Sequence, residues 1–83
     1  MKYLYIGSQT EERFQMLLSL TRIASEDVID ALRDHLVNGA TESNAAAFNG
    51  VKTSNFQRAF NALNEVAAKI ERVKEIDWYS SVK

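Results

Sequence analysis

The sequence predicts an all-α fold, a small single-domain helical bundle in which a helix-turn-helix is followed by a long C-terminal helix. Three observations predict it: apolar residues recur at helical spacing, proline is absent, and the three glycines fall between the periodic stretches. A chain of 83 residues can form only one hydrophobic core. We therefore expect a single helix-turn-helix domain over residues 1–83.

The first helix is expected over residues 11–20. Thr10 is a candidate N-cap, because its hydroxyl can accept a hydrogen bond from a backbone N–H of the first turn. Phe14, Leu17 and Leu18 then recur at the spacing of one helix face.

The second helix is expected over residues 26–38. Ser25 is its candidate N-cap, and two acidic residues follow at the positive end of the helix dipole. Gly39 is a candidate C′ residue that would end the helix. The apolar stripe of this second helix consists of Val28, Ile29, Leu32 and Leu36.

Two further helices are expected over residues 42–49 and 54–75. Thr41 can cap the first of them, and its three alanines make it narrow enough for close approach by another helix. Gly50 separates the two, and Thr53 or Ser54 can cap the second. The long helix is amphipathic, with one face formed by Phe56, Ala59, Phe60, Leu63, Ala67, Ile70 and Val73.

Composition excludes several classes of protein. Without cysteine and with a single histidine, the chain has neither a disulfide framework nor a Cys/His zinc site, so we expect no metal and no cofactor. No apolar stretch is long enough for a signal peptide core or a membrane helix, which predicts a cytoplasmic protein. The net charge of −1 divides unevenly: residues 1–42 carry four basic and seven acidic side chains (−3), and residues 43–83 carry six and four (+2).

The start of the long helix carries residue types that contact DNA. Lysine and arginine neutralise phosphates, asparagine and glutamine pair with adenine, and a helix N-terminus accepts a phosphate oxygen. A solvated polar face is the alternative interpretation. The predicted DNA-binding residues are Lys52, Thr53, Ser54, Asn55, Gln57, Arg58 and Asn61.

The C-terminal apolar stripe has two interpretations: it closes the core over the first two helices, or it forms a self-association surface. The predicted oligomerisation residues are Leu63, Val66, Ile70, Val73 and Trp78.

The second predicted helix also carries a histidine and three regularly spaced acidic residues. We expect His35 to be a partly exposed helical histidine. Glu26, Asp30 and Asp34 lie four residues apart along one helix. This spacing indicates either a solvated face or an acidic surface for a basic patch on a partner, such as a second copy of the chain.

Several residues and one block carry a resemblance to a known family: Gly7-Ser8, Thr10-Glu11, Phe14, Leu17, Ile23, Ser25, the block VIDALRDHLVNG over residues 28–39, and Phe56. By these residues the chain resembles the PapB/FocB-type regulators of fimbrial (adhesin) operons. The likeness runs without gaps from Gly7 to about Trp78, and a more distant similarity to TrfB/KorA-type plasmid repressors covers residues 36–60. The chain departs from the family pattern at Glu42 and Ser43, where relatives tend to carry basic residues.

The resemblance implies a bacterial, nucleoid-associated transcription regulator that binds A·T-rich promoter sites on double-stranded DNA. It also implies cooperative self-association to a dimer or higher oligomer. From the sequence itself we expect no membrane partner and no small-molecule ligand. The alternative is a helical protein-interaction adaptor or anti-regulator that does not bind DNA. An enzyme is not expected, because the sequence presents no paired catalytic carboxylates, phosphate loop or nucleophile with a base.

Overall fold

Helices account for most of the structure, a computed structural model that describes residues 3–81 of the chain and the side chains of residues 3–78. The predicted all-α class is confirmed, and the described residues include no strand. The helices are α1 (Glu11–Ser19), α2 (Glu26–Leu36), α3 (Glu42–Phe48) and α4 (Thr53–Ser81).

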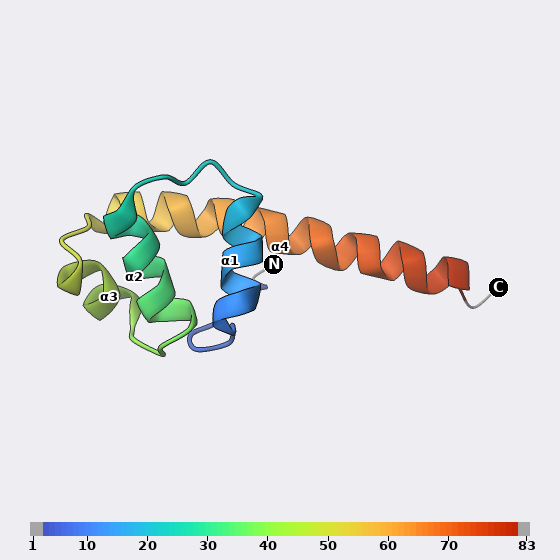
Figure 1. Cartoon of the computed structure of the whole chain (residues 1–83), viewed down its shortest axis with the longest axis horizontal. Helices are drawn as coiled ribbons and strands as arrows, with labels where there is room; N and C mark the ends of the chain where they lie inside the picture. Colours follow the sequence, from blue (N-terminus) through green and yellow to red (C-terminus); the bar gives the residue numbers. More distant parts are fainter. Residues whose placement is uncertain (1–2, 82–83) are drawn as a thin grey trace.

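The three shorter helices pack against the first part of α4, and the last part of α4 extends away from them (Figure 1). We call residues 53–71 of α4 the bundle segment and residues 72–81 the projecting segment. The projecting segment gives the molecule its elongated shape, with extents of 50 × 22 × 22 Å.

The core lies where α1, α2 and α3 meet the bundle segment. The pairing of small with large residues lets α3 approach closely, because Ala45 and Ala46 present little side chain between the backbones. The buried apolar residues are Leu4, Phe14, Leu17, Ala31, Leu32, Leu36, Ala45, Ala46, Phe56, Phe60, Leu63 and Ala67.

Side-chain caps begin two of the helices as predicted. Thr10 accepts a hydrogen bond from the Arg13 N–H at 3.2 Å, and Thr41 accepts one from the Asn44 N–H at 3.2 Å. Ser25 occupies the N-cap position of α2, but its side chain makes no cap hydrogen bond, so that part of the prediction is wrong.

The second helix ends at Leu36, two residues before the predicted end at residue 38. The chain turns at Gly39, whose φ of +85° favours glycine. After the turn, the Ala40 N–H donates to the Asp34 carbonyl at 2.9 Å, so the end of α2 is closed by backbone hydrogen bonds.

The fourth helix is longer than expected, because it continues to Ser81 and the sequence predicted an end near residue 75. No glycine or proline interrupts the additional turns, and ion pairs of the i,i+3 type line the exposed surface. At its other end α4 begins at Thr53. The Phe56 N–H donates to the carbonyl of Lys52, so Lys52 occupies the N-cap position that was predicted for Thr53 or Ser54.

The N-terminal segment is part of the core rather than a tail. Leu4 is fully buried, and the N–H groups of Tyr3 and Leu4 donate to the Asn64 side-chain oxygen at 2.7 and 3.3 Å. The Gly7 N–H donates to the carbonyl of His35 at 2.9 Å. These bonds tie the start of the chain to both α2 and α4.

Candidate nucleic-acid interface

The turn between α3 and α4 determines how the start of α4 is presented. Gly50 adopts a φ of +64°, and the Val51 N–H then donates to the Ala46 carbonyl at 2.9 Å. The Asn49 amide donates both to the Ala45 carbonyl at 2.8 Å and to Asp34 of α2 at 2.9 Å. The turn is thereby attached to α2 as well as to α3.

Two phenylalanines fix the rotation of α4 about its own axis. Phe56 and Phe60 are buried one turn apart, with ring centroids 6.3 Å from each other. Because residues on the opposite side of a helix must then face outward, the side chains of Arg58 and Asn61 are exposed.

Six of the seven predicted DNA-binding residues are exposed at the start of α4. The structure brings them together over the first three turns of the helix and the residue before it. These exposed residues, which we call the α4 face, are Lys52, Thr53, Ser54, Asn55, Arg58 and Asn61.

The seventh residue, Gln57, is half-buried and already has a partner. Its side-chain amide donates to the Glu42 carboxylate at 2.8 Å. Glu42 is the first residue of α3, so this bond joins the two helices. Local sequence patterns do not reveal this pair, because fifteen residues separate its members along the chain.

His35 lies behind that pair and is buried, with 4% of its surface exposed, so the expectation of a partly exposed histidine is wrong. Its ring meets the Phe56 and Phe60 rings edge-on, at centroid distances of 5.8 and 5.9 Å. The apolar stripe of α2 predicts which side of the helix faces the core. It does not predict that the segment before α3, together with α4, also covers His35.

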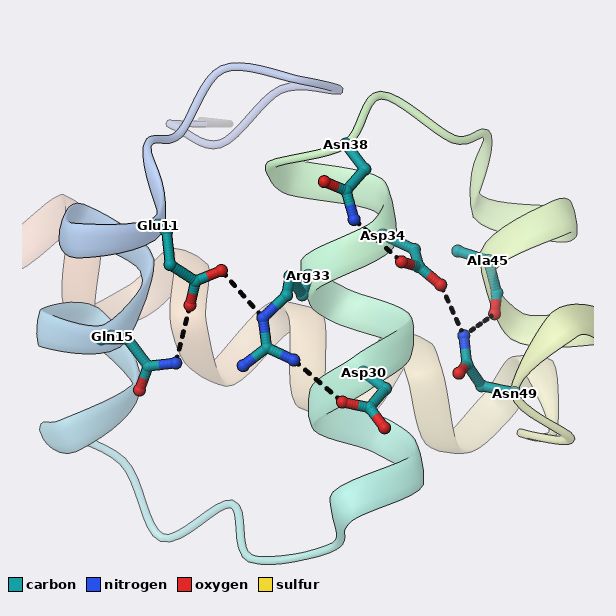
Figure 2. Close-up of polar contacts among 8 residues, drawn as sticks. All are labelled: Glu11, Gln15, Asp30, Arg33, Asp34, Asn38, Ala45 and Asn49. Carbon is teal, nitrogen blue, oxygen red and sulfur yellow. Dashed lines mark hydrogen bonds and ion pairs between the residues drawn. The ribbon is translucent and has the colours of Figure 1, made fainter.

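Of the predicted acidic face of α2, Glu26 is exposed, whereas Asp30 and Asp34 are engaged within the chain (Figure 2). Arg33 donates to Asp30 at 2.9 Å and to Glu11 of α1 at 2.9 Å, and Asp34 accepts from the amides of Asn38 and Asn49. Thus Asp34 joins α2 to the turn after α3, Arg33 joins α2 to α1, and Asp30 pairs with Arg33 within α2, so these residues do not form a purely solvated face.

The hydrogen-bond partners of Glu11 lower the pKa of its carboxyl group. The hydrogen bond from Gln15 holds the pKa of Glu11 below its ordinary value of 4.5, with further lowering by the hydrogen bond and charge of Arg33, while desolvation acts in the opposite direction. The pair is solvent-exposed, so we expect a weak contribution to stability.

A third cation, Arg22, lies beside the two cations of the α4 face. A shallow groove between the loop before α2 and the start of α4 is lined by Arg22, Ile23, Asn55 and Arg58, among others. Arg22 was not among the predicted site residues, because it stands in a loop with no periodic pattern around it. It extends the basic character of this surface from α4 onto the loop before α2.

The predicted oligomerisation residues fall into different environments. Leu63 is completely buried in the core, so its assignment to an oligomerisation surface is wrong. Val66 and Ile70 are half-buried against the core, whereas Val73 and Trp78 are exposed to 55% and 67%. Ile76, which the prediction omitted, is also exposed on the projecting segment.

An apolar groove of about 250 Å³ runs between α1 and the end of the bundle segment. Leu17, Met16, Leu20 and Ile70 contribute to its walls, and Lys74 stands at the start of the projecting segment. Exposed apolar surface therefore continues from α1 to the projecting segment.

Membrane-spanning helices and metal-binding clusters are both absent from the described part of the chain. No helix within residues 3–81 combines the length and apolar character that crossing a membrane requires. Nor do three or more metal-binding side chains gather anywhere among those residues.

Comparison with known proteins identifies the fold and the family. The structure superimposes on the crystal structure of E. coli FocB with a TM-score of 0.83, at 25% sequence identity, covering 90% of this chain and 85% of that one. The F1845 adhesin operon regulatory protein of Escherichia coli is 33% identical over 67 residues, which are 81% of this chain and 79% of that protein. The PapB family, described as adhesin biosynthesis transcription regulatory protein, matches residues 1–77. As the resemblance predicted, the chain belongs to the PapB family of adhesin biosynthesis transcription regulators.

Proposed function

We propose that this regulator acts by binding double-stranded DNA with the α4 face and controls an adhesin operon through A·T-rich promoter sites. The observation that carries the proposal is the exposure of six polar residues at the start of α4, with Phe56 and Phe60 anchoring the helix from behind. Such a protein would act at the bacterial nucleoid.

The residues of the α4 face divide by chemistry into phosphate and base contacts. Lys52 and Arg58 carry positive charge, and the first turn of α4 offers backbone N–H groups that donate to no carbonyl within the helix. Asn55 and Asn61 can donate and accept hydrogen bonds at a base edge. We expect the charged groups to supply affinity and the amides to supply selectivity.

Binding by one protomer should be weak, because the α4 face holds only two cations and Arg22 beside it adds a third. We therefore propose that neighbouring copies bind side by side and associate as a dimer or higher oligomer. The exposed Val73, Ile76 and Trp78 of the projecting segment are suitable for that contact, since association would remove their apolar surface from water.

The same projecting segment is what favours the alternative function, a protein-interaction adaptor that does not bind DNA. An adaptor would bind a different protein through Val73, Ile76 and Trp78, and the α4 face would be an ordinary solvated surface. The two functions make opposite predictions for DNA binding.

The test is a fluorescence anisotropy titration with a labelled A·T-rich promoter duplex at low salt. Arg58→Ala should weaken binding by about 1–3 kcal/mol and reduce the salt dependence. Arg72→Ala is the matched control, because Arg72 carries the same charge on the projecting segment, where it pairs with Glu75. Equal effects of the two substitutions would contradict the α4 face, and no binding by the unmodified protein up to micromolar concentration would contradict DNA binding altogether.

A further inference from the structure

The groove between the loop before α2 and the start of α4 receives an arginine from each of the two segments. Arg22 comes from the loop, and Arg58 comes from the second turn of α4. The groove measures about 370 Å³, and no aspartate or glutamate of the described chain lines it. Two segments that lie far apart in the sequence thus place positive charge around one hollow of the surface.

The arginines of this groove differ from the other described arginines in having no partner. Arg33 and Arg72 form ion pairs with carboxylates, and Arg13 donates to a side-chain amide oxygen at 3.1 Å. Within the described part of the chain, no hydrogen bond or ion pair engages the side chain of Arg22 or Arg58. Both side chains are exposed, so their N–H groups are available to an anion that enters the groove.

The acidic residues that follow Arg22 in the sequence do not neutralise it. Glu26 and Asp27 lie in the first turn of α2, where they interact favourably with the helix dipole. Neither residue lines the groove, and the described residues include no ion pair between either of them and Arg22. An anion in the groove therefore meets two cations and no carboxylate.

The helix before α4 offers no comparable positive charge. In helix-turn-helix proteins the first helix of the pair crosses the DNA backbone. Here α3 contains neither lysine nor arginine, and its first residue is Glu42, whose carboxylate would repel phosphates. Gln57 bonds to that carboxylate, whereas Arg58, the next residue, lines the groove. The cations beside α4 thus lie toward the loop before α2 and not toward α3.

We propose that this groove, rather than α3, holds a backbone phosphate of bound DNA, with Arg22 and Arg58 as its cationic partners. The proposal rests on the proposed function of the α4 face and adds the path of the DNA backbone, which would pass between α4 and the loop before α2. Arginine binds phosphate oxygens through charge-assisted hydrogen bonds. A phosphate contact carries no sequence information, so the groove should contribute affinity on every DNA sequence.

The first experiment measures the salt dependence of DNA binding by fluorescence anisotropy. Arg22→Ala should weaken binding about fivefold at low salt and reduce the slope of log K against log salt by about 0.9, the value for one lost phosphate contact. The loss should be equal on an A·T-rich duplex and on a duplex with those pairs changed to G·C. Arg22→Lys keeps the charge and should retain the slope of the unmodified protein.

Arg13→Ala is the matched control, since it removes the same charge from α1 outside the groove. It should leave the salt slope unchanged. If the unmodified protein binds DNA and Arg22→Ala changes the slope no more than Arg13→Ala does, the inference is overturned while the proposed function stands. If the unmodified protein binds neither duplex up to micromolar concentration, the proposed function itself fails.

A double-mutant cycle tests whether the two arginines hold the same phosphate. The double variant of Arg22→Ala and Arg58→Ala should lose less affinity than the product of the two single fold-changes, because a phosphate released by one arginine is held less well by the other. A loss equal to that product would mean two independent contacts and would overturn the shared site.

Sedimentation equilibrium without DNA distinguishes a phosphate from an acidic segment of a second copy as the occupant of the groove. Arg22→Ala should leave the association constant unchanged, because the groove is assigned to DNA. Weaker association of Arg22→Ala in the absence of DNA would assign the groove to a contact between copies and overturn the inference.

Discussion

The bundle segment and the projecting segment of α4 carry the same kind of apolar stripe in one unbroken helix, yet only the first is covered. Phe56 and Leu63 are buried by three other helices, whereas Val73, Ile76 and Trp78 face solvent. The difference is the extent of α1 and α2, which pack only beside the bundle segment (Figure 1). An apolar stripe on a helix thus predicts a surface that packs against something, but it does not tell whether the same chain or another molecule covers it.

The largest expected effect tests whether the two segments differ in stability. Phe56→Ala should lower the free energy of unfolding by about 3–5 kcal/mol, because it leaves a cavity among α2, α3 and α4. Val73→Ala, an apolar truncation on the projecting segment, should change the unfolding free energy of the monomer by less than about 0.5 kcal/mol. Urea denaturation at low protein concentration measures both, and similar losses would mean that the projecting segment is covered within the monomer.

The next effect concerns what the projecting segment does. Ile76→Asp should weaken self-association by about tenfold or more, because it places a charge in an apolar contact. Sedimentation equilibrium measures the association constant, and circular dichroism checks that the helix remains formed. Glu75→Gln, one residue away and exposed, is the control. An association constant insensitive to Ile76→Asp would contradict a role of this segment in oligomerisation.

A smaller effect tests how firmly α3 supports the bundle segment. Thr41→Ala removes the side-chain cap of α3 and should cost about 1 kcal/mol of unfolding free energy. Ser25→Ala is the matched substitution at α2, where the serine makes no cap hydrogen bond, and it should cost less. Thermal unfolding of the two variants in one buffer gives the comparison, and a larger loss in Ser25→Ala would contradict the observed caps.

The smallest effect concerns exposed ion pairs in the two parts of the molecule. Since the folded state lowers the pKa of Glu11, this group stabilises the fold above its ordinary value of 4.5, and the stabilisation is lost as the pH falls through the lower folded pKa. Glu11→Gln should therefore slightly flatten the loss of stability below about pH 4.5. Glu75→Gln breaks the Arg72 pair on the projecting segment and provides the comparison. Unfolding curves between about pH 3 and pH 6 measure both, and an identical acid limb in Glu11→Gln would contradict the shift.

Local patterns predicted the helices well, because each depends on residues close together in the sequence. The caps at Thr10 and Thr41 follow from one side chain and the N–H three residues later. The same patterns failed where distant segments meet. His35 is buried because α3 and α4 cover it, and Leu4 is buried because the N-terminal segment returns to Asn64.

The candidate site likewise has features that local sequence patterns predict and features that depend on contacts between distant segments. Exposure of Arg58 and Asn61 follows from the periodicity that buries Phe56 and Phe60, so the sequence indicated that face. The partner of Gln57 could not be found in this way, since Glu42 lies in another helix. Arg22 was missed for a similar reason, because it reaches the edge of the site from a loop.

By itself the sequence determined the all-α class, the approximate helix positions and the family, since periodicity, glycine placement and the residues 28–39 are local properties of the chain. Only the tertiary structure decided which part of one apolar stripe is core and which is surface, and which polar side chains engage each other. The physical reason is that burial and hydrogen bonding between helices depend on where distant segments are placed. The positions of Leu63 and Trp78 on the same helix illustrate it, with one completely buried and the other largely exposed.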